Sequence, residues 1–131
     1  MKRDCKIVRP SPDGKRAIYV DTLNKNEIKG YLFSDDRHKK KFQFICDIIF
    51  GGHRNTELYD KEDINERCSD VTAMKFFKRQ ENDRIYCKEL KSKSGISIVV
   101  MSILHPRKKS DGNSNKEITL IETVASYEYE I

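Results

Sequence analysis

Three runs of apolar residues follow one another in the second half of the chain and predict a three-stranded meander. The runs cover residues 71–78, 84–90 and 96–104, and each is rich in β-branched or aromatic side chains. Polar segments at 80–83 and 91–95 separate them as turns. The third run has apolar residues at both odd and even positions, among them Ile98, Val99 and Val100. We therefore expect it to be the central strand, covered on both faces.

The first 22 residues predict a β-hairpin. Two strand-like segments, 4–9 and 15–22, flank the sequence Pro-Ser-Pro-Asp-Gly at 10–14. Proline presets the backbone for a turn, and the Asp-Gly pair tolerates the positive φ angles that tight turns require. The two segments are therefore expected to pair with each other.

Two helical segments are predicted to follow. Asn24 is placed to cap a short helical turn that ends near Gly30. Ser34 or Asp35 is placed to cap a longer helix over residues 36–50, which has acidic residues in its first turn and Phe42, Ile45, Ile48 and Ile49 on one face. Two consecutive glycines then end it.

The remaining segments complete an α+β layout. We expect a short helix around residues 61–67, a final helix over 115–126, and a tail at 127–131 that pairs as a strand or packs as an extended arm. The order predicts a single domain over residues 1–131. Its core would be a small antiparallel sheet, made of the N-terminal strand or hairpin and the meander, with helices packed on it.

The composition limits the class of protein. Apolar residues make up 37% of the chain and charged residues 36%, and no apolar run approaches the ~20 residues that span a bilayer. We expect a cytoplasmic protein without a membrane partner. The four cysteines are widely scattered without a Cys-x-x-Cys motif, which favours free thiols over disulfides or zinc. We predict no metal and no cofactor.

The positive charge is concentrated on the predicted meander. The whole chain has a formal net charge of +5, whereas residues 71–109 contain ten Lys and Arg against three acids, a net charge of +7. Clustered cations repel one another unless an anion neutralises them. This distribution favours a polyanionic partner such as RNA.

The meander carries the groups that RNA cleavage without a metal requires. A base must take the proton of the 2′-hydroxyl, cations must stabilise the phosphorane, and an acid must protonate the leaving oxygen. The candidates for catalysis are Lys75, Lys78, Arg84, His105, Arg107 and Tyr127. The candidates for RNA contact are Arg79, Tyr86, Lys88, Lys108, Lys109 and Tyr129. The alternative is that these cations are only solvated, or that they bind an anionic surface of a partner without catalysis.

Three short motifs and their order resemble a known family. The strand Met-Lys-Phe-Phe-Lys-Arg at 74–79 precedes the strand Arg-Ile-Tyr-Cys-Lys-Glu at 84–89, and a hydrophobic strand then ends in Leu-His-Pro-Arg-Lys-Lys at 104–109. With the helix and aromatic tail that follow, this pattern resembles the RelE/ParE superfamily of bacterial type II toxins, including RelE-like and HigB-like mRNA interferases. The resemblance covers residues 71–109, extends to about 129 with the final helix, and is loose before residue 71.

The resemblance implies a function and roles for particular residues. Such toxins cleave mRNA without metal, often on the ribosome, until a cognate antitoxin inhibits them. Lys75 and Lys78 would correspond to the lysines before the Arg-x-x-Tyr strand, and Arg84 to its first arginine. The family has a further arginine or lysine at the end of the next strand, and here that residue would be Arg107, Lys108 or Lys109. The general acid, or the ring that stacks on a base, would be His105, Tyr127 or Tyr129. The alternatives are a ParE-like, non-catalytic toxin that binds a protein such as DNA gyrase, and an RNA-binding domain without catalysis.

Overall fold

The computed structural model describes residues 2–53, 55, 57–62, 64–77, 83–106 and 115–131. The described strands are β1 (Arg3–Pro10), β2 (Arg16–Asp21), β3 (Tyr59–Lys61), β4 (Val71–Phe76), β5 (Asp83–Lys91), β6 (Ser97–His105) and β7 (Tyr129–Glu130). The α-helices are α1 (Lys25–Leu32), α2 (Asp36–Phe50) and α3 (Asn115–Ser126). Two short 3₁₀ helices, η1 (Thr22–Asn24) and η2 (Glu66–Cys68), connect them.

The sheet is larger than expected and mixed in direction. Its seven strands run in the order β3-β4-β5-β6-β2-β1-β7 and curve into a half-barrel. Neighbours are antiparallel except β2 with β6 and β1 with β7, which are parallel. The expectation of a small antiparallel sheet is therefore wrong. The chain leaves β2 through α1 and α2 before it enters the meander, and a connection of that length lets β2 and β6 run in the same direction.

The predicted meander and hairpin are present. β1 pairs antiparallel with β2, and β4, β5 and β6 pair as consecutive antiparallel neighbours. β6 is the fourth of the seven strands, which confirms that the run with apolar residues on both faces is central. Its buried residues contribute to clusters on both sides of the sheet.

Local hydrogen bonds explain the boundaries of α2. The carboxylate of Asp35 accepts from the backbone N–H of His38 at 2.8 Å, so Asp35 caps this helix. At the other end, the N–H of Gly52 donates to the carbonyl of Ile49 and that of His53 to Ile48, at 3.0 and 3.1 Å. Gly52 has a φ of +74°, the left-handed conformation that this type of helix end requires.

Two local predictions need correction. Asn24 is the N-cap residue of α1, as predicted, but its side chain makes no capping hydrogen bond, because its amide donates to the carbonyl of Ser102 at 2.7 Å. The expected helix near residues 61–67 is instead β3 followed by η2. The buried ring of Tyr59 explains the strand, since Tyr59 is the register partner of Met74 at the edge of the sheet.

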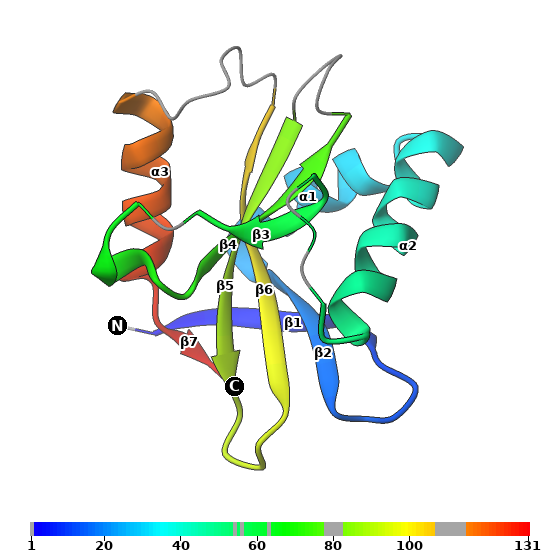
Figure 1. Cartoon of the computed structure of the whole chain (residues 1–131), viewed down its shortest axis with the longest axis horizontal. Coiled ribbons are helices and arrows are strands. Elements are labelled where there is room, and N and C mark those ends of the chain that lie inside the picture. Colours follow the sequence, from blue (N-terminus) through cyan, green and yellow to red (C-terminus); the bar gives the residue numbers. More distant parts are fainter. Residues whose placement is uncertain (1, 54, 56, 63, 78–82, 107–114) are drawn as a thin grey trace.

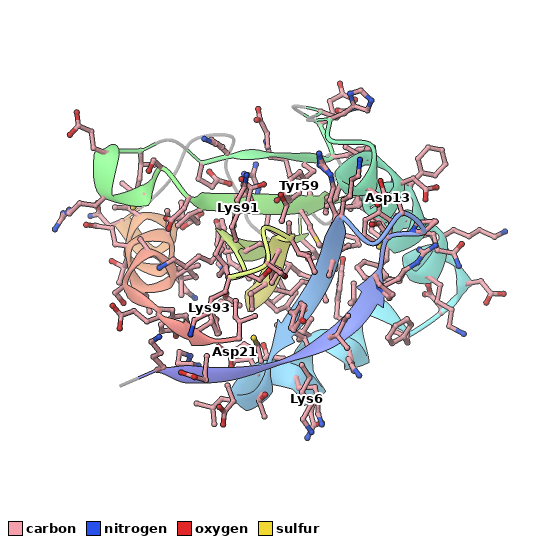
Figure 2. The ribbon with its side chains drawn as sticks, turned by 90° about the horizontal axis from the view of Figure 1, so that it is seen from below. Lys6, Asp13, Asp21, Tyr59, Lys91 and Lys93 are labelled. Atoms are coloured by element: carbon pink, nitrogen blue, oxygen red, sulfur yellow. The ribbon has the colours of Figure 1, made fainter. Side chains whose placement is uncertain are left out.

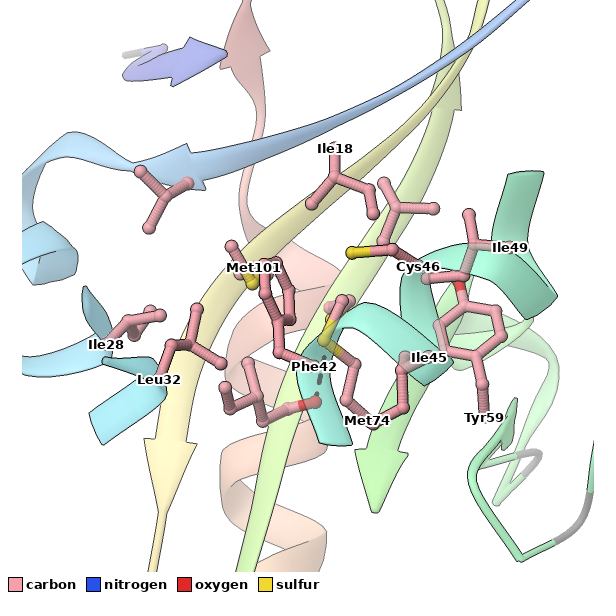
Figure 3. Packing of buried hydrophobic residues seen from close by; sticks show 14 of the residues in the cluster. Ile18, Ile28, Leu32, Phe42, Ile45, Cys46, Ile49, Tyr59, Met74 and Met101 are labelled. Atoms are coloured by element: carbon pink, nitrogen blue, oxygen red, sulfur yellow. Dashed lines mark hydrogen bonds between the residues drawn. The ribbon is translucent and has the colours of Figure 1, made fainter. Parts of the chain in front are cut away.

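Helices cover the two faces of the sheet in separate layers. Figure 1 shows α1 and α2 on one side and α3 on the other. The α1–α2 side holds the largest apolar cluster, in which Phe42, Ile45 and Ile49 pack against Ile18, Met74 and Met101 (Figure 3). On the other side Ile121 and Val124 of α3 pack on Ala73 and Tyr86. Each fully buried aliphatic side chain stabilises the fold by roughly 1.5–3 kcal/mol.

The C-terminal tail forms a strand, and a hydrogen bond to the buried carboxylate of Asp21 holds this strand on the sheet. β7 lies parallel to β1, with Arg3 paired to Tyr129. The carboxylate of Asp21, which is fully buried, accepts from Arg3 Nε at 2.7 Å, from the hydroxyl of Tyr129 at 2.7 Å and from the N–H of Leu23 at 2.9 Å. The Tyr129 hydroxyl is also 2.8 Å from that of Ser102 on β6. This network joins the tail to three other segments.

Candidate functional site

Three of the predicted site residues lie side by side on adjacent strands. Lys75 at the end of β4 is the register partner of Arg84 at the start of β5, and Arg84 is the partner of His105 at the end of β6. Residues paired in this way share a face and have Cα atoms about 4.5–5.5 Å apart. Tyr86, two positions after Arg84, packs against α3, so this cationic row (Lys75, Arg84 and His105) faces the α3 layer.

Arg84 is held by a carboxylate that the sequence did not indicate. Its Nη1 donates to Glu62 Oε1 at 2.9 Å, and both side chains are buried. Within the described part of the chain, Arg84 Nε is buried and has no hydrogen-bond partner. In a buried ion pair, the cost of removing both charges from water offsets much of their Coulomb attraction. Removing one partner is nevertheless strongly destabilising, because it leaves an uncompensated buried charge. Glu62 therefore fixes the guanidinium in a position where one donor is left over.

His105 has a carboxylate neighbour as well. Its Nε2 lies 3.8 Å from Oε1 of Glu117, in the first turn of α3, and the imidazole stacks on Tyr86 with ring centroids 6.2 Å apart and an angle of 17° between the planes. His105 and Glu117 are only 8% and 4% exposed. Glu117 thus lies beside His105, at a distance longer than a hydrogen bond.

Tyr86 lies beside the cationic row and packs against α3. Its side chain is fully buried, and no described residue accepts from or donates to its hydroxyl. Burial raises the pKa of Tyr86, so the group stays a neutral phenol at physiological pH. Two polar groups of this site, the Tyr86 hydroxyl and Arg84 Nε, are thus buried without a hydrogen-bond partner among the described residues.

The arrangement combines the groups that phosphoryl chemistry uses. A guanidinium holds phosphate oxygens, an ammonium stabilises added negative charge, and an imidazole beside a carboxylate transfers protons near neutral pH. Lys75 is half-buried and, like Glu62, His105 and Glu117, takes part in further interactions within the protein. In the described part of the chain no three His, Cys, Asp or Glu side chains converge as a metal site.

Three predicted residues lie elsewhere. Lys88 Nζ donates to the carbonyls of Ala125, at 2.9 Å, and Tyr127, so it holds β5 to the C-terminal end of α3. Tyr129 is buried in the Asp21 network, and the ring of Tyr127 lies under the guanidinium of Arg3, 3.9 Å from it. The 12-residue helix α3 is ~18 Å long, and these residues lie at the opposite end from Glu117. They are not part of the cationic row.

Five further predicted residues lie outside the described residues. They are Lys78, Arg79, Arg107, Lys108 and Lys109. Of the residues that the sequence reasoning missed, Glu117 carried a detectable signal, since it is an acidic residue in the first turn of the final predicted helix. Glu62 carried none, because it lies in a polar segment where a different structure was expected.

No protein-family model matches the chain, no curated protein matches it, and no solved structure matches it. None of the helices in the described ranges is both long and apolar enough to cross a membrane.

Proposed function

We propose that the protein is an RNA endonuclease of the toxin type, which cleaves mRNA at the cationic row. The observation that supports this proposal best is the register of three adjacent strands, which aligns Lys75, Arg84 and His105 on one face. Residues 71–109 have a net charge of +7, which attracts a polyanion to the same sheet. The proposal rests on this chemistry and on the short motifs, and not on a shared fold.

In the proposed reaction the 2′-oxygen attacks the neighbouring phosphorus while the bond from phosphorus to the 5′-oxygen breaks. Arg84 binds the phosphate through Nε, which has no partner among the described residues, and Lys75 accepts the 2′-hydroxyl proton and then stabilises the phosphorane as an ammonium. His105, which lies beside Glu117, gives a proton to the leaving 5′-oxygen. The products are a 2′,3′-cyclic phosphate and a free 5′-hydroxyl.

The proposal includes the partners that such a toxin has. The substrate is mRNA, bound free or on the ribosome in the cytoplasm, and a cognate antitoxin protein neutralises the toxin. Residues 78–82 and 107–114, which flank the cationic row in sequence, contain five of the predicted RNA-contacting or catalytic cations. These cations would add to the attraction between the protein and RNA phosphates.

One observation favours the alternative of a non-catalytic toxin or binding domain. Arg84 and His105 already have the carboxylates of Glu62 and Glu117 as neighbours, and all four side chains are buried. A network of this kind also occurs where charges only stabilise a domain interior. In that case the exposed cations would bind a protein or RNA surface without cleaving it.

The experiment is RNA cleavage by the purified protein, on free mRNA and on programmed ribosomes, with identification of the new ends. We expect 2′,3′-cyclic phosphate and 5′-hydroxyl ends, and a loss of at least ~100-fold in rate for His105→Asn. Lys39→Ala is the matched control, because Lys39 is an exposed lysine on α2. No cleavage by the wild-type protein would rule out the enzyme, and full activity in both His105→Asn and Lys75→Ala would rule out the cationic row as its active site.

A further inference from the structure

The outer side of α2 presents an aromatic ring next to two lysines. Phe44 is 67% exposed, and within α2, all of whose residues are described, it is the only large apolar side chain that is exposed. Lys40 and Lys41 precede it by four and three residues, so the three side chains lie on the same side of the helix. Lys40 is exposed and Lys41 is half-buried. We call these three residues the α2 face.

The lysines of the α2 face have no carboxylate partner. Neither Lys40 nor Lys41 forms an ion pair with a described residue, although Asp36 and Asp47 belong to the same helix. The helix contains four Lys and Arg against these two acids, a net charge of +2. Neighbouring cations without a counterion attract an anion. The charge of the α2 face therefore complements an anionic partner.

A strained residue of β4 supports one end of the α2 face. Phe77 has a φ of +50°, a conformation that costs free energy in a residue with a β-carbon. Alternation along a strand would direct Phe76 and Phe77 to opposite faces, but Phe76 packs on α1 and Phe77 on α2. The guanidinium of Arg37 and the ammonium of Lys41 lie 3.8 and 5.6 Å from the centroid of the Phe77 ring. Backbone strain of this kind is concentrated at functional sites.

The α2 face is separate from the cationic row. Figure 1 shows α2 on the side of the sheet opposite α3, whereas the cationic row faces α3. The two surfaces are nevertheless joined through the end of β4, because Phe77 follows Lys75 by two residues, or ~7 Å of extended chain. A polymer bound to the α2 face thus lies on the other side of the sheet from the row.

A single strand of nucleic acid fits the α2 face better than a membrane or a partner helix does. An unpaired base stacks on an exposed ring while neighbouring lysines contact its phosphates. A membrane-surface helix needs a broad apolar side, and a partner helix needs several apolar anchors, but Phe44 is a single ring. The chemistry of the face therefore points to unpaired bases on a phosphate backbone.

We propose that the α2 face binds single-stranded RNA, with one unpaired base stacked on Phe44 and phosphates on Lys40 and Lys41. This contact goes beyond the proposed function, because it holds RNA outside the cationic row and requires no cleavage. It therefore stands whether or not the row is an active site.

Fluorescence anisotropy of the full chain with a labelled, single-stranded 2′-O-methyl oligonucleotide of about ten residues tests the proposal. This probe has no 2′-hydroxyl that could attack phosphorus, so a failure to bind is distinguishable from a failure to cleave. We expect Phe44→Leu to weaken binding at least ~5-fold through the loss of one stacked base, and Phe44→Tyr, which keeps a ring, to bind within ~2-fold of the wild type. Phe44 is exposed, so neither change alters the core.

The lysines have a different signature, which is the dependence of binding on salt. Lys40→Ala should reduce the slope of log K against log salt concentration by about 0.7, the value for one phosphate contact on a single strand. Lys39→Ala is the matched control, because Lys39 is exposed on the same helix but lies five residues before Phe44, on a different side. Lys93→Ala, in the turn between β5 and β6 that Figure 2 shows from below, is a second control. Both controls should keep the wild-type slope and affinity.

Three results would overturn the proposal: no binding of the probe, wild-type binding by Phe44→Leu, or equal loss of slope in Lys39→Ala and Lys40→Ala. Attachment of the protein to phosphatidylserine vesicles without binding of the probe would also overturn it, and would assign the α2 face to a membrane surface instead.

Discussion

The hydroxyl of Tyr129 donates to the carboxylate of Asp21 at 2.7 Å, and both groups are buried. The bond joins the C-terminal strand β7 to the end of β2, next to the pair between Arg3 and Asp21. Burial raises the pKa of Tyr129, so the phenol remains a donor throughout the physiological range. A residue that the sequence offered as an RNA-stacking tyrosine thus serves to hold the tail on the sheet.

Tyr129→Phe should destabilise the fold by about 1–3 kcal/mol. The substitution keeps the ring but leaves Asp21 and Ser102 without one hydrogen-bond partner each in a buried site. Tyr127→Phe is the control, because the Tyr127 hydroxyl has no hydrogen bond to a described residue, and it should change stability by less than about 0.5 kcal/mol. Urea denaturation measures both; equal effects would contradict the role assigned to the Tyr129 hydroxyl.

Arg84→Ala should destabilise the protein by about 3–5 kcal/mol, because it leaves the buried carboxylate of Glu62 without its cation. Lys75→Ala, at the half-buried neighbouring position, should cost less than half of this. Chemical denaturation of both variants checks the prediction. A small loss for Arg84→Ala would mean that Glu62 is solvated. A loss of RNA cleavage in an Arg84 variant would therefore bear on the proposed function only when the folding of that variant has been measured.

Two glycine-to-alanine substitutions should act in opposite directions. Gly30 lies in α1 with no atom within 4 Å of the position of a Cβ, so Gly30→Ala should stabilise the protein by about 0.5–1 kcal/mol. Gly52 has a φ of +74° and lies against Arg16, so Gly52→Ala should destabilise it by about 1–2 kcal/mol. Thermal unfolding of the pair tests both signs, and destabilisation by Gly30→Ala would refute the first.

Cys5 should be the first cysteine to react with iodoacetamide, but slowly. Cys46, Cys68 and Cys87 are buried, whereas Cys5 is half-buried. Desolvation, with the nearby acids Asp21 and Asp4, raises the pKa of Cys5 from 9.0 to about 11. The thiolate fraction at pH 8 is then ~100-fold below that of a free thiol, and it should rise about tenfold per pH unit up to pH 11. Mass spectrometry of alkylated peptides measures the rate; a plateau near pH 9 would contradict the shift.

The local pattern predicted most of the elements because each depends on neighbouring residues. The apolar positions of residues 96–104 identified the central strand, and Asp35 marked the start of α2. The pairing of Arg16 with Ser97 was not predictable in this way, because the pattern of apolar residues within each segment does not show which other segment it pairs with. The mixed sheet followed from that pairing and was missed.

The candidate site was predictable only in part, for a related reason. The charges and the proton-transferring groups of the meander indicated Lys75, Arg84 and His105, which lie together because consecutive strands of a meander pair with each other. This reasoning did not find Glu62, which pairs with Arg84, or Glu117, which lies beside His105, because both belong to other segments of the chain. The tail alternates with period two, but this period does not tell which of Tyr127 and Tyr129 points into the core.

The parallel pairing of β2 with β6 has a consequence for how the chain reaches its native state. The β1–β2 hairpin and the β4–β6 meander each form from close neighbours, but they join along the pairing of β2 with β6, which runs from Arg16–Ser97 to Val20–Met101. The loop between β2 and β6 must close, at a cost in chain entropy, before the contacts between these strands can form. We therefore expect the pairing of β2 with β6 to limit the folding rate. Until β6 leaves the ribosome, the edge of β2 that it will cover is open to other strands, and this is the stage at which the nascent chain is most prone to aggregate.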